Sequence, residues 1–121
     1  MEKTIEEYIL EQKSLCKKYN LDWIEADFEL IIGLSENVFS DMIPINGLRH
    51  PIEKGTTGWY IWSGEEFKEE DDFFKPFCVK HLLERKPEVI KYLGLPPGFR
   101  FMIDNVGYED IWEDNNLLKL E

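Results

Sequence analysis

Apolar side chains recur at three- and four-residue spacing along residues 4–19, with charged residues between them. This is the period of an amphipathic helix that places one face on a core and the other in water. Thr4 and Glu7 have the spacing of a capping box at the start, and Asn20 can end the helix in the left-handed conformation. The pattern therefore predicts an N-terminal helix over residues 4–19.

The apolar runs that follow are shorter and have the β-branched and aromatic residues typical of strands. Residues 28–34 predict a strand, although so short a run could also be a buried helix. Residues 58–64 are aromatic, bounded by glycines, and predict the central strand. Residues 35–58, which are rich in glycine and proline, predict a long connection with short extended pieces such as 42–45.

The C-terminal half of the chain predicts two short helices and a hairpin. Residues 77–93 divide at Pro87, which suits the first turn of a second helix. Residues 99–104 predict a strand, and residues 108–112 return antiparallel to it after a turn. We therefore expect one α+β domain over residues 1–121. It should hold a small, mostly antiparallel sheet of three to five strands, with the N-terminal helix and two short helices packed on one face.

The composition indicates one hydrophobic core and an acidic exterior. The 121 residues are 43% hydrophobic, which is enough apolar surface for one domain to fold. The formal net charge is -11, from 25 acidic against 14 basic residues. This charge repels phosphate backbones and anionic lipids, so nucleic acid and membrane surfaces are disfavoured as partners. It would attract a basic protein, although many acidic proteins carry such a charge for solubility alone.

Targeting signals and cysteine usage favour a cytoplasmic protein. The first residues are acidic where a secretory signal would be basic, and no apolar run approaches the roughly 20 residues that cross a bilayer. Cys16 and Cys78 lie far apart and fit no metal or redox spacing. In a reducing compartment we expect both to be buried or half-buried thiols.

Residues that often act in catalysis are present without the spacing that known sites require. There is no glycine-rich phosphate loop, no dinucleotide fingerprint and no calcium loop. A zinc site at His50 or His81 would need ligands from distant segments, so His81 is expected to be structural. A nucleophilic Cys78/His81 pair is an alternative, but no orienting group or oxyanion site can be placed beside it. We expect no catalytic residue, no metal and no cofactor.

The tryptophans allow two interpretations. Trp59, Trp62 and Trp112 could form an aromatic recognition surface, although large aromatic residues on strands more often lie in the core. Because side chains alternate along a strand, at least one tryptophan of residues 58–64 should face the side opposite to Tyr60.

Five motifs follow one another in order between residues 47 and 118. They are Gly47-Leu48-Arg49-His50-Pro51, Gly58-Trp59-Tyr60-Ile61-Trp62-Ser63-Gly64-Glu65-Glu66, Asp72-Phe73-Phe74, Leu93-Gly94-Leu95-Pro96-Pro97-Gly98-Phe99-Arg100-Phe101 and Tyr108-Glu109-Asp110-Ile111-Trp112. The series resembles a bacterial family of small proteins described as immunity-protein-like, of the type numbered thirty-three. The resemblance implies a cytosolic protein that binds and neutralises a bacterial toxin, with no enzyme activity and no cofactor.

Acidic side chains are the candidate contact surface for a basic toxin. Immunity proteins commonly cover a toxin's basic surface with acidic groups, because complementary charge speeds association. The candidate partner-binding residues are Glu65, Glu66, Glu69, Asp71, Asp72, Glu109 and Asp110. The same residues could instead be a solvated face. Two alternatives to a toxin-binding protein are a general protein-binding or regulatory domain without catalytic activity and an uncharacterised hydrolase.

Overall fold

A six-stranded sheet forms the centre of the computed structural model, which describes residues 4–64 and 74–118. The strands are β1 (Ile31–Leu34), β2 (Ile45–Arg49), β3 (Thr56–Ser63), β4 (Lys75–Cys78), β5 (Phe99–Ile103) and β6 (Glu109–Glu113). Their order across the sheet is β4-β1-β3-β2-β5-β6. The β1–β3 pair is parallel and the other four pairs are antiparallel.

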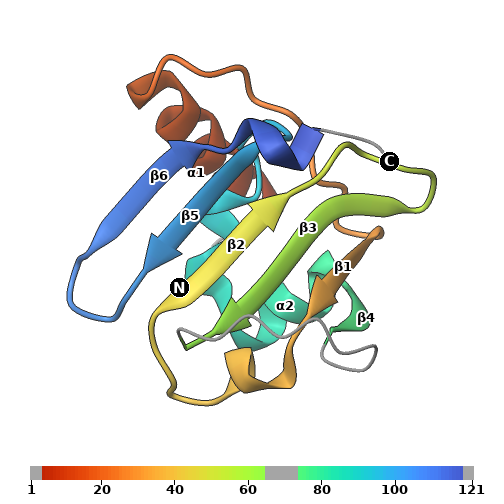
Figure 1. The fold of residues 1–121 in the computed structure, drawn as a ribbon, viewed down its shortest axis with the longest axis vertical. Coiled ribbons are helices and arrows are strands. Elements are labelled where there is room, and N and C mark those ends of the chain that lie inside the picture. Colours follow the sequence, from red (N-terminus) through yellow and green to blue (C-terminus); the bar gives the residue numbers. More distant parts are fainter. Residues whose placement is uncertain (1–3, 65–73, 119–121) are drawn as a thin grey trace.

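The helices divide unequally between the two faces of this sheet. The helical elements are α1 (Ile5–Lys18), α2 (Val79–Arg85) and the 3₁₀ helices η1 (Glu36–Phe39), η2 (Pro87–Tyr92) and η3 (Asn115–Leu118). Figure 1 shows α1 and α2 behind the sheet and the short blue η3 in front of it. We call these two sides the helix face and the open face.

The predicted N-terminal helix is confirmed. Its start has the full capping box, in which the Thr4 hydroxyl accepts from the Glu7 main chain and the Glu7 carboxylate accepts from the Thr4 main chain. Asn20, just beyond its end, has φ 59°, the left-handed conformation expected there. The predicted hairpin of residues 99–104 and 108–112 is also confirmed, as β5 and β6.

The expected number of strands was too low, because β2 lies inside the segment interpreted as a long connection. All five β2 residues are buried, so the strand shows no polar alternation. Gly47 belongs there because the Phe101 ring packs against it, and an added Cβ would clash with that ring. The sheet is also mixed: β1 pairs with β3 on the side away from β2 and runs parallel to β3.

The main core lies between the sheet and its helices. Fully buried side chains from β1, β3 and β5 meet those from α2 and η2, and Leu15 and Cys16 of α1 join them. The central sheet members are Leu34, Trp59, Ile61 and Phe101. Cys16 is buried and Cys78 half-buried, and both are free thiols as predicted.

Arg49 is an unexpected member of this core, with an exposed fraction of 0%. Among the described residues its guanidinium donates five hydrogen bonds to main-chain carbonyls, at 2.8 to 3.2 Å. The acceptors are Ile24, Glu25, Thr57, Leu93 and Leu95. Burial lowers its pKa to about 10, so the group stays charged at neutral pH. Arg49 thus ties three separate segments to β2.

Candidate functional site

Strand β3 supplies side chains to both faces of the sheet. Trp59 and Ile61 point into the main core and are 1% and 0% exposed. Tyr60 lies on the open face and is 38% exposed, and Trp62 lies on the same face in a small cluster of its own. The prediction that a strand tryptophan would lie opposite to Tyr60 is therefore confirmed for Trp59.

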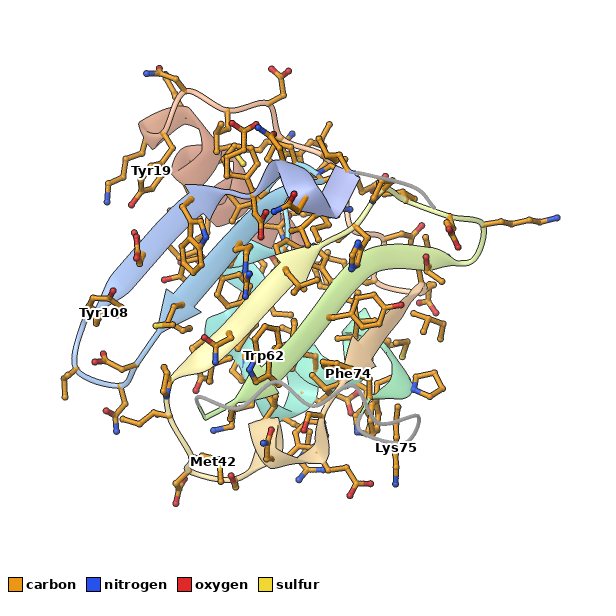
Figure 2. The ribbon with its side chains drawn as sticks, viewed as in Figure 1. Tyr19, Met42, Trp62, Phe74, Lys75 and Tyr108 are labelled. Carbon is orange, nitrogen blue, oxygen red and sulfur yellow. The ribbon has the colours of Figure 1, made fainter. Side chains whose placement is uncertain are left out.

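Two rows of side chains cross the open face in register. The first row is Tyr60, Leu48, Arg100 and Trp112, and the second is Trp62, Asn46, Met102 and Asp110. Each row takes one residue from each of β3, β2, β5 and β6, so neighbours stand at cross-strand distance. Figure 2 shows Trp62 in front of β3 on this face. The open face is therefore rich in aromatic side chains, with an acid at its β6 end.

Arg100 lies between two indole rings on this face. Its guanidinium carbon is 5.4 Å from the Trp112 ring centre and 6.0 Å from that of Trp62. Its Nη1 lies 3.2 Å from the Asp114 carboxylate, while its buried Nε has no hydrogen-bond partner among the described residues. The positive charge at the centre of the face is therefore balanced locally by Asp114. Trp62 is buried, Trp112 is half-buried and Asp110 is exposed.

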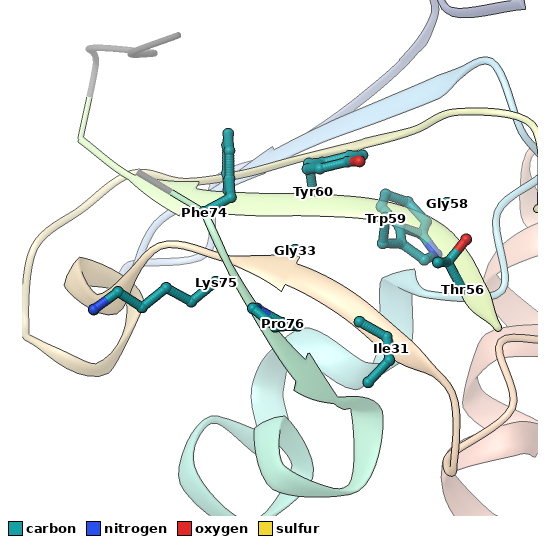
Figure 3. A pocket seen from close by; sticks show the side chains of 9 residues that line it. All are labelled: Ile31, Gly33, Thr56, Gly58, Trp59, Tyr60, Phe74, Lys75 and Pro76. Carbon is teal, nitrogen blue, oxygen red and sulfur yellow. The ribbon is translucent and has the colours of Figure 1, made fainter. Parts of the chain in front are cut away.

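A hollow of about 210 Å³ opens where the first row reaches β1 and β4. Its wall includes Tyr60, Phe74 and Pro76, with Gly33 between them. The Tyr60 ring packs over Gly33, where an added Cβ would lie 2.6 Å from it, and meets Phe74 edge to face at 5.3 Å. Figure 3 shows Tyr60 and Phe74 on one side of the sheet. The hollow could receive one apolar or aromatic side chain of a partner.

His50 links the open face to the C-terminal 3₁₀ helix. Its Nδ1 lies 3.2 Å from the Leu117 carbonyl oxygen, and its ring meets the Tyr60 ring edge to face at 5.5 Å. Leu117 in turn packs with Leu48 and Trp62. His50 therefore holds η3 against the open face, which is a structural role.

The predicted acidic contact residues belong to two segments of the chain, and the structure describes only one of them. Glu65, Glu66, Glu69, Asp71 and Asp72 lie outside the described residues. Their segment follows β3 and precedes Phe74, whose ring meets Trp62 at 6.2 Å.

The other two predicted residues, Glu109 and Asp110, are adjacent on β6 and so point to opposite faces. Asp110 is exposed on the open face, where the Tyr108 hydroxyl donates to it at 3.4 Å.

Glu109 joins β6 to the helices on the other face. Its carboxylate accepts hydrogen bonds from Tyr92 at 2.7 Å and Tyr19 at 3.1 Å, and lies 3.6 Å from both Lys18 and Lys91. Partial burial acts to raise the pKa of Glu109, but the two hydroxyl donors and the two ammonium groups outweigh it, so the pKa lies below its usual value. Burial and the Glu109 hydrogen bond raise the pKa of Tyr92. Glu109 stabilises the position of β6.

Cys78 and His81, the candidate nucleophilic pair, lie at the start and in the first turn of α2. His81 stacks on Phe77 at 5.0 Å and meets Phe39 edge to face at 5.7 Å. Cys78 is the residue at the start of α2, and no hydrogen bond joins it to His81 among the described residues. Within residues 4–64 and 74–118, no three His, Cys, Asp or Glu side chains gather as metal ligands would. His81 is part of an aromatic cluster, as expected for a structural histidine.

Sequence reasoning missed the two cross-strand rows, which require the pairing of β2 with β3 and β5. The available signal was that side chains of residues 58–64 alternate between the two faces of a strand. This alternation places Trp59 on one face and Tyr60 and Trp62 on the other. Without β2 as a strand, nothing in the sequence placed Leu48 or Asn46 beside them.

Comparison with known proteins gives a family. The Imm33-like domain model matches residues 11–114, which is most of the chain. Neither the comparison with curated proteins nor that with solved structures gave a match. None of the helices in the described part of the chain has the length and apolar character needed to cross a membrane. The match covers both the helix face and the open face, and the chain therefore belongs to the Imm33-like family of immunity-protein-like domains.

Proposed function

We propose that this protein is an immunity protein that binds and neutralises a bacterial toxin domain in the cytoplasm, without catalysing a reaction. The family match over residues 11–114 carries the proposal. An immunity protein needs a stable surface that is not used by its own fold. The open face of the sheet, with Tyr60 and Asp110 exposed, is suited to that task.

The charge of the chain favours a basic toxin. A net charge of -11 on 121 residues draws a positively charged partner and raises the rate of encounter. Because this attraction acts between solvated charges, it weakens as salt shortens the Debye length to about 8 Å at physiological ionic strength. Association with the toxin should therefore slow as the salt concentration rises.

The proposed contact surface combines acidic residues with aromatic anchors. The acids are Glu65, Glu66, Glu69, Asp71 and Asp72 after β3 and Asp110 on β6. The anchors are Tyr60 and Trp112, because aromatic side chains supply much of the binding energy at protein interfaces. Glu109 supports this surface from behind, through Tyr19 and Tyr92. The hollow beside Tyr60 would take a side chain of the toxin.

Growth rescue tests the proposal directly. If the neighbouring gene encodes a toxin domain, that domain is expressed in a sensitive strain with and without the protein, and the protein should restore growth. Reversing Asp71 and Asp72 to lysine should slow association about tenfold or more at low salt and weaken rescue. The matched control is Glu29→Lys with Glu84→Lys, which changes the net charge equally at two exposed positions outside the proposed surface.

The outcomes separate the candidate functions. Rescue that weakens with the Asp71/Asp72 reversal and persists in the control supports both the function and the surface. Equal rescue by both variants would reject the acidic surface but keep the immunity role. No rescue, together with capture of a housekeeping protein in cells without a toxin gene, would favour the general protein-binding domain.

A further inference from the structure

The two edges of the sheet differ in how they expose their backbone. Strand β4, at one edge, contains Lys75 and Pro76, two residue types that discourage the addition of another strand. Strand β6, at the other edge, reads Glu109-Asp110-Ile111-Trp112-Glu113 and has neither. Within the described residues no strand pairs with the outer side of β6. The β6 edge is therefore open to a further strand.

The register of the hairpin fixes which backbone groups face outward. Asp104 donates to the Tyr108 carbonyl and Asp114 donates to the Gly98 carbonyl, at the two ends of the β5–β6 ladder. Hydrogen-bonded and non-bonded pairs alternate between these ends. Asp110 and Trp112 thus direct their N–H and C=O groups toward β5. Residues 109, 111 and 113 direct theirs outward, which leaves three donors and three acceptors along the edge.

The side chains along this edge define the chemistry of its partner. Asp110 and Glu113 are exposed carboxylates on the two faces of β6, and Ile111 and Trp112 are half-buried apolar neighbours between them. The Glu109 charge is already balanced by Lys18 and Lys91. Within residues 4–64 and 74–118 no ion pair involves Asp110 or Glu113, so a strand added here would meet negative charge on both sides of an apolar centre. Lysine or arginine flanking an aliphatic residue would complement it.

A second copy of this chain does not fit the same edge. Two β6 strands paired antiparallel about Ile111 would place Glu109 of each opposite Glu113 of the other. Like charges directly opposite each other on neighbouring strands are destabilising. The edge therefore disfavours its own copy and accepts a basic strand.

We infer that β6 is a docking edge for a basic extended segment of the partner protein, which adds to the sheet as a seventh strand. The inference deepens the proposed function and rests on it, since the segment would belong to the toxin. Main-chain hydrogen bonds would supply affinity, and the flanking acids would select lysine or arginine. The partner would thus contact both the β6 edge and the part of the open face near Asp110.

A peptide probe tests this edge without the toxin. The probe is Thr-Lys-Tyr-Val-Lys-Lys-Thr, blocked at both ends, and amide hydrogen exchange of the intact protein is followed by NMR. Saturation with the peptide should slow exchange at Glu109, Ile111 and Glu113 about tenfold or more. The amides of Asp110 and Trp112, already bonded to β5, should change little. This alternation is specific to strand addition.

Three comparisons test the contributions of strand pairing and of charge to this binding. The same peptide with N-methyl groups on the amides that face β6 keeps its charge but should lose binding. A peptide with glutamate in place of lysine should also fail to bind. In the protein, Glu113→Pro removes an outward donor and should weaken binding about fivefold more than Glu113→Gln, which removes only the charge. Thermal unfolding confirms that both variants are folded.

Binding without the alternating protection, or equal binding by the N-methylated peptide, would overturn the inference. The growth assay remains a separate test. Full rescue by the wild-type protein combined with no protection at β6 would reject the docking edge and leave the immunity function standing. Failure of rescue would reject the immunity function, whatever the peptide does.

Discussion

The two faces of the sheet differ in whether their polar side chains bind within the fold or are exposed to solvent. On the helix face, the charged groups of Arg49 and Glu109 bind partners within the fold. Arg49 donates to five main-chain carbonyls. Glu109 accepts from two hydroxyls and lies beside two ammonium groups. On the open face, Tyr60 and Asp110 keep polar or aromatic surface exposed. Arg49 and Glu109 therefore stabilise the fold, and we propose that the exposed side chains of the open face serve a partner.

The two faces should differ most in stability when the adjacent aromatic residues of β3, Trp59 and Tyr60, are replaced. Trp59→Ala should lower the free energy of unfolding by about 3–5 kcal/mol, because it empties a large volume of the main core. Tyr60→Ala should cost about 1 kcal/mol, since its ring is partly in water. Urea denaturation measures both. For toxin binding the order should reverse, and Tyr60→Ala should weaken the affinity of the folded protein. Similar stability losses in the two variants would break the contrast.

Replacement of Arg49 should also destabilise the fold strongly. Arg49→Met keeps much of the volume but leaves five carbonyls without their donor, so we expect a loss of about 3 kcal/mol. Arg49→Lys should recover only part of it, because an ammonium group cannot reach all five acceptors. The matched control is Arg100→Met on the open face, which should cost about 1 kcal/mol or less. A small loss in the free energy of unfolding of Arg49→Met, measured by urea denaturation, would show that the carbonyls find other partners.

Glu109 should make the free energy of unfolding depend on pH, by about 1–2 kcal/mol. Folding lowers the pKa of Glu109, so the unfolded state binds more protons between the two pKa values and stability rises with pH there. The contribution is complete above the ordinary glutamate pKa and is lost as the pH falls through the lower, folded value. Urea midpoints from neutral pH to about pH 3 should show this loss, and Glu109→Gln should flatten it. If the urea midpoint of Glu109→Gln falls with pH as steeply as that of the wild-type protein, Glu109 is not the group responsible.

The local patterns of the sequence were sufficient for much of the fold. Helical periodicity with the Thr4/Glu7 box located α1, and the alternation after Pro97-Gly98 located the β5–β6 hairpin. Strand β2 was missed because its residues are buried on both faces and include Gly47, so the alternation that marks a half-exposed strand is absent. The expected three to five strands became six for that reason and because β4 is short and contains Pro76.

The candidate site was harder to predict than the fold because it depends on strand order. Glu109 and Asp110 are neighbours in sequence, yet the pleat of β6 sends one to the helices and the other to the open face. The role of Arg49 could not be foreseen either, since arginine is rarely buried and its five acceptors come from distant segments. In both cases the information lies in long-range pairing and not in local spacing.

Hydrogen exchange of the complex with the toxin domain would show which face of the sheet contacts the toxin. If the open face is the contact surface, the main-chain amides of β2, β3 and β5, already in the sheet, should change little. The solvent accessibility of Tyr60 and Trp112 to side-chain footprinting should fall, and, if β6 is also the docking edge, protection should appear at its outward amides. The result that contradicts the account is protection on the outer sides of α1 and α2 with Tyr60 and Trp112 still fully reactive.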